Sequence, residues 1–274
     1  MNLAERRGRF RELHESGCFV MPNPWDRGSA VALASLGFPA LATSSAALGY
    51  SLGRLDLPGS IGTDDALAHV HEIVGATALP VNVDFQNGYG ASASEVAEHV
   101  ASCVARGAAG LSIEDASEDP AAPLFDRSEA IDRFMAAREV TGPEIVLTGR
   151  CEAFLVGAPD PLETAIDRLV AFAEAGADCL YAPGLQTPEQ VSALVEAVAP
   201  KPVNVLASVG PEWMTVESLA NLGVRRITLG SSLSKVAWTA LLGAAREVAD
   251  SGLFSRLRSA HPVPSLDDIF GTDS

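Results

Sequence analysis

The sequence predicts an α/β fold, a (β/α)8 barrel of the TIM type, and three observations carry that prediction. Short apolar runs alternate with longer amphipathic or Ala-rich runs along most of the chain, and strict alternation of this kind gives parallel strands with right-handed crossovers. Eight such units fit into 274 residues, a normal length for a closed barrel. Glycines end several helical runs just before the next strand, at Gly37, Gly107, Gly176 and Gly223. An open doubly wound sheet is the alternative architecture.

The individual elements follow from the same patterns. Strands are expected at 18–23, 39–45, 79–85, 109–115, 144–150, 177–183, 201–207 and 224–230. Helices are expected from the capping residue Asp26 to Gly37, from near Thr63, and at 94–106, 128–140, 161–175, 187–198, 215–222 and 231–250. We expect one barrel domain over 1–274, whose last helix and tail (231–274) form an extension on the surface or on a neighbouring subunit.

Charge and composition restrict the kinds of partner. The formal charge is −16, from 35 acidic and 19 basic residues, so we expect neither a nucleic-acid groove nor an anionic membrane surface as partner, because both need a basic footprint. The sequence has no apolar run long enough for a membrane helix and no signal-peptide core, which predicts a cytoplasmic protein. Its four cysteines lie far apart without a CxxC pair, which favours reduced thiols.

Polar residues follow three neighbouring strands, where barrel enzymes carry their chemistry. Asp84 and Glu114 end adjacent strands and Arg150 ends the next one. Two buried carboxylates repel unless a cation or a proton separates them, and Mg²⁺ suits such a pair. The alternative is that Glu114 or Asp115 caps its own loop and Asp84 bonds to its glycine turn. A buried arginine needs an anion, which can be a substrate carboxylate or, alternatively, Glu152 or Glu114.

Several kinds of catalytic site find no support. The chain has two lysines, of which Lys201 precedes a strand and Lys235 lies in the last helix, so a Schiff-base aldolase is not expected. None of the five histidines falls at a strand end, and we expect them at the surface. Neither a phosphate-binding loop nor a dinucleotide fingerprint is present.

Eight segments at these positions resemble the isocitrate lyase/phosphoenolpyruvate mutase superfamily. They are PNPWDRGSA, GFPALATSSAALGYSLGRLD, PVNVDFQNGYG, GLSIED, GRCEAFLVG, APGL, KPVNVL and GVRRITLG, and they span nearly the whole chain in order. The resemblance implies a (β/α)8 barrel, a Mg²⁺ or Mn²⁺ cofactor and a small anionic 2-oxo or 2-hydroxy acid as substrate. It also implies a homodimer or homotetramer that exchanges a C-terminal helix.

The resemblance assigns roles position by position. It implies metal binding by Asp84, Glu114 and Asp56, with Gln86 as a further ligand, and substrate binding by Ser44, the backbone N–H groups of Ser45 and Ala46, Arg150 and Asn204. Arg150, Asp56 and Glu114 are expected to act in catalysis, with Tyr89 or Glu118 on the lid as a candidate proton donor.

Two departures from the superfamily pattern bear on function. The turn before Gly-Tyr-Gly carries Gln86 where the superfamily has a second acid, which keeps an oxygen ligand but removes a charge. The segment ASEDPAAPLFD (116–126) lacks the catalytic cysteine of the lyases and the lysine of the mutases. Cys151 is an alternative thiol, although a small buried residue is the favoured interpretation.

We therefore predict a Mg²⁺-dependent lyase that acts on a small 2-oxo acid or dicarboxylate through an enolate, by C–C cleavage or decarboxylation. One alternative is a phosphonopyruvate mutase or hydrolase that acts on a P–C bond. Another is a barrel that has lost catalysis and binds a carboxylate effector, which Gln86 keeps open.

Overall fold

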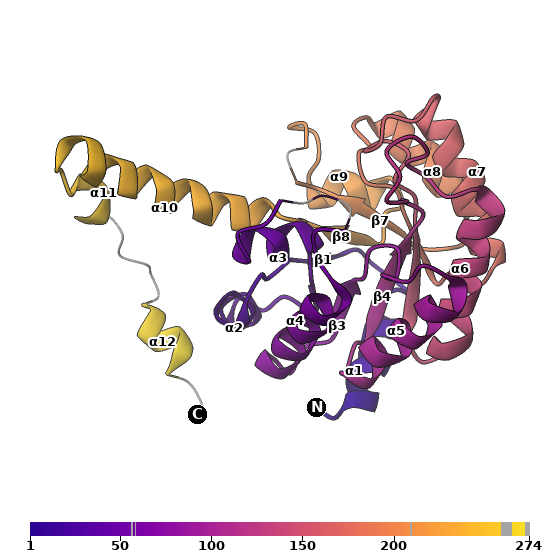
Figure 1. The fold of residues 1–274 in the computed structure, drawn as a ribbon, viewed down its shortest axis with the longest axis horizontal. Coiled ribbons are helices and arrows are strands. Elements are labelled where there is room, and N and C mark those ends of the chain that lie inside the picture. The colour runs from indigo at the N-terminus through magenta and orange to yellow at the C-terminus, as the bar shows by residue number, and fades with distance from the viewer. Residues whose placement is uncertain (56, 58, 209, 259–264, 272–274) are drawn as a thin grey trace.

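Eight parallel strands form a nearly closed barrel surrounded by helices (Figure 1). The structure, a computed structural model, describes residues 1–55, 57, 59–208, 210–258 and 265–271. The strands are β1 (Phe19–Met21), β2 (Leu41–Ala42), β3 (Val81–Asp84), β4 (Gly110–Glu114), β5 (Val146–Arg150), β6 (Cys179–Tyr181), β7 (Val203–Leu206) and β8 (Arg226–Thr228). Each lies inside the range expected from the sequence, so the predicted (β/α)8 barrel is confirmed.

The order of the strands brings all their carboxyl ends to one rim. They pair in the order β1-β8-β7-β6-β5-β4-β3-β2, and each of the seven ladders is parallel. Between β1 and β2 the Ala42 N–H donates to the carbonyl of Pro22 at 3.1 Å. The Asn23 side chain also donates to the carbonyl of Thr43 at 2.8 Å. These two bonds link the first strand to the second, which an open doubly wound sheet would not do.

The helices cover the outside of the barrel and extend beyond it. They are α1 (Leu3–Glu12), α2 (Arg27–Ser35), α3 (Ser45–Ser51), α4 (Thr63–Ala76), α5 (Ala93–Ala105), α6 (Arg127–Thr141), α7 (Pro161–Glu174), α8 (Pro188–Val198), α9 (Val216–Asn221), α10 (Ser232–Ser251), α11 (Ser255–Arg258) and α12 (Leu266–Phe270). Asp26 caps α2 as predicted, its carboxylate accepting from the backbone of Ser29. The four glycines expected to end helices all have φ between 82° and 99°, a conformation that strains residues with a Cβ.

Helix α1 closes the bottom of the barrel and was not predicted. Asn2 and Glu5 form a capping box at its start. Its Phe10 is fully buried among residues at the beginnings of the strands, such as Phe19 and Val146. His14 lies one turn further, and its Nδ1 atom donates to the Phe10 carbonyl at 2.7 Å. Because a carbonyl oxygen only accepts, Nδ1 carries the proton.

The expectation of surface histidines is therefore wrong for His14, and it is also wrong for His69, which is buried on α4. Burial, the largest cause, lowers the pKa of His14 to about 3, so the ring is neutral at physiological pH.

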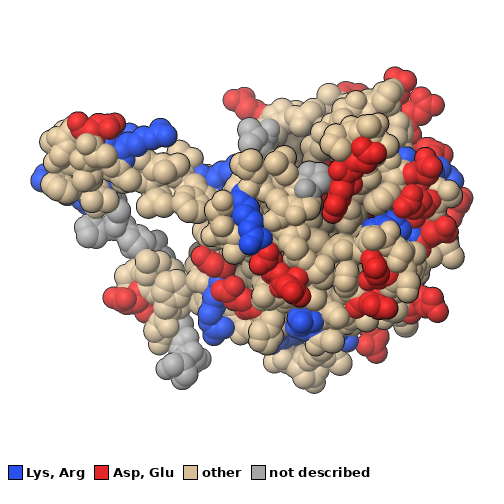
Figure 2. Space-filling model, viewed as in Figure 1, with Lys and Arg blue, Asp and Glu red and all other residues tan. Residues whose placement is uncertain are grey.

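Helix α10 projects away from the barrel and carries α11 at its far end (Figure 1). It leaves several apolar side chains exposed, among them Val236, Leu241 and Leu242. Helix α12 returns to contact α2. Figure 2 shows the projecting arm clearly, and it shows acidic side chains spread over the visible face of the barrel. In the described part of the chain, no helix has the length and apolar character needed to cross a membrane.

Candidate functional site

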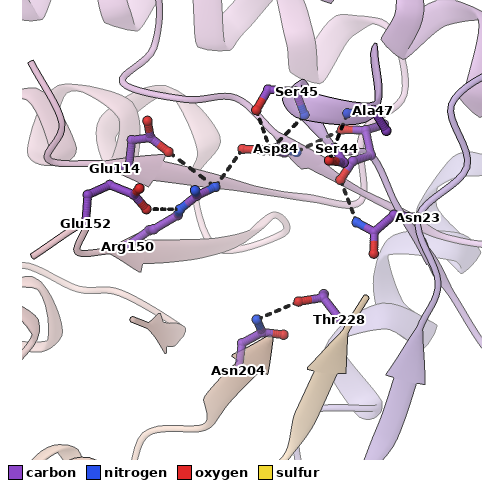
Figure 3. A network of polar contacts seen from close by, with 11 residues as sticks. Asn23, Ser44, Ser45, Ala47, Asp84, Glu114, Arg150, Glu152, Asn204 and Thr228 are labelled. Atoms are coloured by element: carbon purple, nitrogen blue, oxygen red, sulfur yellow. Dashed lines mark hydrogen bonds and ion pairs between the residues drawn. The ribbon is translucent and has the colours of Figure 1, made fainter. Parts of the chain in front are cut away.

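The three residues that end β3, β4 and β5 meet at the carboxyl rim of the barrel. In the strand register Glu114 of β4 lies beside Arg150 of β5. On the other side of β4, Asp84 of β3 lies beside Ser112. The Arg150 Nη1 atom is 3.0 Å from Asp84 Oδ1 and 3.2 Å from Glu114 Oε2 (Figure 3). The structure thus brings together the arginine and the two acids that the sequence analysis singled out.

A third acid joins the same guanidinium. Glu152 Oε1 accepts from Arg150 Nε at 2.5 Å, so one positive side chain contacts three carboxylates. The four side chains are between 8% and 14% exposed. Burial, reinforced by the neighbouring acids and opposed by Arg150, raises the pKa of Glu114 well above its ordinary value. Burial disfavours the charge of Arg150, but the carboxylates outweigh it and raise the pKa of Arg150. Ionisation of all three acids would give the cluster a net negative charge, which either a proton, as the raised pKa of Glu114 indicates, or an additional cation would balance.

Asp84 also ties the cluster to the start of α3. Its Oδ2 atom accepts from the Ser45 backbone N–H at 2.9 Å and from the Ser45 hydroxyl at 3.0 Å. The hydroxyl of Ser44 caps the helix by accepting from the Ala47 N–H at 3.3 Å. The three residues expected to cradle a substrate carboxylate thus lie next to Asp84. However, the Ser45 N–H is directed to Asp84 in this structure, not to open space.

Two cavities meet at Arg150. The first, which we call the barrel cavity, has a volume of about 210 Å³ and reaches from the start of α3 into the barrel. Its lining includes Ser44, Ser45, Ala46, Asn82, Asp84, Arg150, Asn204, Arg226, Thr228 and Lys235. The second, the lid cavity, has a volume of about 420 Å³, and its lining includes Gln86, Glu114, Glu118, Asp119, Arg150 and Glu152. Both cavities share Ser45, Arg150 and Leu155.

The segment after β4 forms one wall of the lid cavity. It folds back on itself through an antiparallel bridge between Ala116 and Leu124. A bond of 2.9 Å from the Ser117 N–H to the Pro123 carbonyl supports this turn. The segment 116–126 therefore lies where a lid over Glu114 would be.

The turn after β3 places Gln86 beside Glu114. Gln86 has a φ of 42° and its carbonyl accepts from the Glu114 N–H at 2.9 Å, while its side chain lines the lid cavity. Two glycines allow the turn to pack on α5, because a Cβ on Gly88 or Gly90 would lie within 2.7 Å of Val96 atoms. This close packing explains the Gly-Tyr-Gly sequence.

Tyr89 and Asp56 differ from the other predicted site residues. The Tyr89 ring packs edge-on against Phe85, with 5.0 Å between ring centres. It lines neither the barrel cavity nor the lid cavity. Asp56 lies outside the described residues. The alternative thiol, Cys151, is buried, and burial raises its pKa, so it is a packing residue and not an activated nucleophile.

Asn204 lines the barrel cavity as expected, but it belongs to a polar group that the sequence analysis missed. Its amide donates to the Thr228 hydroxyl at 3.0 Å and accepts from Arg226 Nε at 2.9 Å. Lys235, on the first turn of α10, also lines this cavity. A signal for Arg226 was present, since alternation along 224–230 places residues 226 and 228 on one face of the strand.

Comparisons with known proteins agree with this geometry. The sequence profile of the phosphoenolpyruvate phosphomutase family matches residues 10–249. An oxaloacetate decarboxylase of Rhodopseudomonas palustris is 32% identical over 272 residues, which cover 96% of this chain and 92% of that protein. A solved structure described as a putative lyase/mutase from Burkholderia cenocepacia is 38% identical, with a TM-score of 0.93 over 99% of this chain and 98% of that one.

An oxaloacetate acetylhydrolase, solved with its product oxalate, is 26% identical and has a TM-score of 0.86 over 98% of this chain and 95% of that one. The family profile covers most of the chain, and the relatives match along nearly their full length. The chain therefore belongs to the phosphoenolpyruvate phosphomutase family, within the phosphoenolpyruvate mutase/isocitrate lyase superfamily.

Proposed function

We propose that this protein is a carbon–carbon lyase that acts on a small 2-oxo acid or dicarboxylate with the help of Mg²⁺ or Mn²⁺. The observation that carries the proposal is the contact of Arg150 with Asp84 and Glu114 where the two cavities meet. Two of the similar proteins named above act on oxaloacetate, a 2-oxo dicarboxylate, which supports this choice of substrate class.

Three acids around one guanidinium would, when ionised, attract a divalent cation, although the described residues contain no group of three His, Cys, Asp or Glu side chains arranged to hold a metal ion. Asp84, Glu114 and Glu152 contribute three carboxylates against the one guanidinium of Arg150. We assign metal binding to Asp84, Glu114 and Gln86, with Asp56 as a further expected ligand, because oxygen donors of this kind suit Mg²⁺. The ion would act as a Lewis acid on the oxo and carboxylate oxygens of the substrate.

The remaining residues would bind the substrate and stabilise charge. When the bond between C3 and its carboxylate breaks with loss of CO₂, its electron pair forms the C2=C3 double bond of an enolate, and the π electrons of the oxo group move onto the oxo oxygen. Arg150, already fixed by three carboxylates, would stabilise that developing charge. Ser45, Ala46 and Asn204 line the cavity where a substrate carboxylate would lie. The Ser45 N–H donates to Asp84 in this structure and would have to leave that carboxylate to bind the substrate. We assign no proton transfer to Tyr89, because its ring lines neither cavity.

Chemistry on a P–C bond has less support. The lid segment 116–126 contains no lysine, the residue that the resemblance to the mutases would place there. The two lysines of the chain are Lys201 and Lys235, and neither belongs to the lid cavity.

We also propose that the chain self-associates through α10. The exposed Val236, Leu241 and Leu242 side chains support this proposal, because exposed apolar surface of this kind marks an interface. Light scattering should give the mass of a dimer or tetramer, and Leu241→Glu should lower it. A monomer at micromolar concentration in the wild type would contradict the proposal.

Isothermal titration with Mg²⁺ and Mn²⁺, with and without oxalate as a mimic of the enolate, tests the proposed site. We expect binding of the metal, tighter binding in the presence of oxalate, and loss of both in Asp84→Ala. Asp167→Ala is the control, because it removes one exposed carboxylate that pairs with Arg127 on the barrel exterior. Absence of metal binding in the millimolar range, even with oxalate, would leave a metal-free carboxylate-binding barrel as the better account.

A further inference from the structure

A second buried ion pair lies directly behind the Arg150 cluster. Asp115 follows Glu114 in the sequence and is fully buried. Its Oδ2 atom is 3.2 Å from Nη1 of Arg168, a residue of α7 whose side chain is 15% exposed. Arg168 lines an outer groove together with Arg127, and it belongs to neither of the two cavities that meet at Arg150. The ion pair thus connects the exterior of the barrel with the back of the candidate site.

The other carboxylate oxygen of Asp115 faces the site. Its Oδ1 atom accepts from the backbone N–H of Glu152 at 2.8 Å. The side chain of Glu152 in turn accepts from Arg150 Nε at 2.5 Å. Asp115 therefore fixes the backbone of the residue whose carboxylate fixes Arg150. An unbroken series of contacts runs from Arg168 to the guanidinium of Arg150.

The backbone of Asp115 is held independently of its side chain. Its N–H donates to the carbonyl of Arg150 at 3.2 Å, and its carbonyl accepts from the N–H of Phe125, at the end of the lid segment, at 2.9 Å. The Cys151 thiol also bonds to the Asp115 carboxylate. Because strand and lid hold the backbone in place, loss of Arg168 would act mainly on the carboxylate.

Asp115 is a fourth acid beside the three that share Arg150. Its negative charge acts on both Glu114 and Glu152. A buried carboxylate needs a cation close by, and among the described residues Arg168 is the cation paired with Asp115. Without Arg168, Asp115 would be an uncompensated charge next to Glu152, and the two carboxylates would repel each other. This repulsion would act on the bond that holds Arg150.

From these contacts we infer that Arg168 is a positioning residue for the Arg150 guanidinium. It acts through Asp115, which holds the backbone of Glu152, and so keeps Arg150 in its orientation where the two cavities meet (Figure 3). The role of Arg150 in catalysis rests on the proposed function. The orientation of its guanidinium does not, and it can be measured without a substrate.

Hydrogen exchange at the Arg150 side chain tests the inference. The Nε–H group donates to Glu152, so its exchange with solvent, followed by proton–nitrogen NMR, reports whether that bond is kept. Arg150→Lys, which has no Nε–H group, identifies the signal. In folded Arg168→Met we expect this exchange to be at least about tenfold faster than in the wild type, the effect of weakening one hydrogen bond to a charged group. Unchanged exchange would overturn the inference.

Two further variants separate positioning from a general effect. Arg127→Met should leave the exchange unchanged, because Arg127 lines the same outer groove but pairs with the exposed Asp167. Arg168→Lys should stay close to the wild type, since one contact at 3.2 Å needs the charge and not the guanidinium fork. Arg168→Gln, which keeps a donor and removes the charge, gives the same comparison if Arg168→Met does not fold.

The slowly exchanging backbone amides of the barrel strands serve as an internal reference. A variant that is merely less stable would accelerate exchange at these amides and at the Arg150 side chain by the same factor. Such a uniform change would count against the inference. We expect instead that the Arg150 Nε–H signal changes far more than the reference amides.

A double variant tests whether Arg168 acts through Asp115. Asp115→Asn/Arg168→Met removes both charges and keeps a side-chain oxygen that can accept from the Glu152 N–H. We expect its Arg150 Nε–H group to exchange more slowly than that of Arg168→Met alone. Equally fast exchange in the two variants would show that Arg168 acts by another route, and would refute the inference.

The two proposals can fail separately. If the Arg150 signal responds as expected but the wild type binds no metal and cleaves no 2-oxo acid, the positioning role stands and the proposed lyase activity fails. Metal-dependent cleavage together with an Arg150 signal that does not respond to Arg168→Met would do the reverse.

Discussion

Replacement of Arg150 by methionine should destabilise the protein strongly, because it removes the one cation that three buried carboxylates share. The side chain makes ion pairs of 3.0 Å to Asp84, 3.2 Å to Glu114 and 2.5 Å to Glu152. Removal of one partner of a buried ion pair leaves an uncompensated charge and costs about 3–5 kcal/mol. We therefore expect Arg150→Met to lower the free energy of unfolding by about that amount at neutral pH.

The loss should depend on pH with a defined sign. The pKa of Glu114 in the folded protein is raised above its ordinary value, and so is that of Glu152. An acid whose pKa is raised in the folded state stabilises the protein fully at a pH below its pKa in the unfolded state. That contribution is lost as the pH rises through its pKa in the folded state. Arg150 opposes the rise in both acids, so its removal raises both pKa values further. The destabilisation should be small near pH 4.5 and should grow toward neutral pH.

Urea unfolding of wild type and Arg150→Met between pH 4.5 and 8 measures this difference. Arg127→Met is the matched control, because its ion pair with Asp167 is exposed and should contribute no more than about 1 kcal/mol. A loss below about 1 kcal/mol at neutral pH, or a loss that does not change with pH, would refute the reasoning.

Three further predictions follow from packing and burial. Gly90→Ala should destabilise the protein by about 1–3 kcal/mol, because its Cβ would lie 2.6 Å from the Val96 backbone nitrogen. Gly75→Ala on α4 has open space around the new Cβ and should stabilise the protein by about 0.5 kcal/mol. Urea unfolding measures the sign of both changes. Burial lowers the pKa of His14 to about 3 in the folded protein. The free energy of unfolding therefore decreases as the pH falls below the ordinary pKa of histidine, because only the unfolded chain then takes up the proton. Between pH 7 and 5, the free energy of unfolding of His14→Gln should therefore fall by about 2 kcal/mol less than that of the wild type. An equal fall in both proteins would contradict this prediction. In a native thiol titration Cys18 alone should react, since the other three cysteines are buried; a second fast thiol would show that the core opens.

The strand ends were predictable because parallel strands in a barrel share one rim. That rule alone places Asp84, Glu114 and Arg150 together, and the structure confirms their proximity. The pairing of Arg150 with Glu152 was considered as an alternative to a substrate anion. The structure shows that one guanidinium reaches all three acids, a point of side-chain geometry that a strand pattern does not contain.

The bottom of the barrel was not predictable in the same way. The first helix is polar and charged, so its sequence resembles an exposed segment. Phe10 on this helix and His14, just beyond its end, are nevertheless buried at the barrel floor. The contact between His14 and Arg226 joins residues 212 positions apart. No local sequence pattern indicates such a contact. The positive charge of the barrel cavity was not predicted for the same reason, because it also depends on residues that are far apart in the sequence.

The most direct test of the central claim is bond cleavage itself. Carbon-13 NMR would follow oxaloacetate and other 2-oxo acids with enzyme and Mg²⁺, against controls without enzyme that correct for spontaneous decarboxylation. The account predicts cleavage of a C–C bond that stops when the metal is chelated and falls at least about 100-fold in Asp84→Asn. Cleavage that continues undiminished in Asp84→Asn, or no cleavage of any 2-oxo acid by a metal-loaded enzyme, would contradict it.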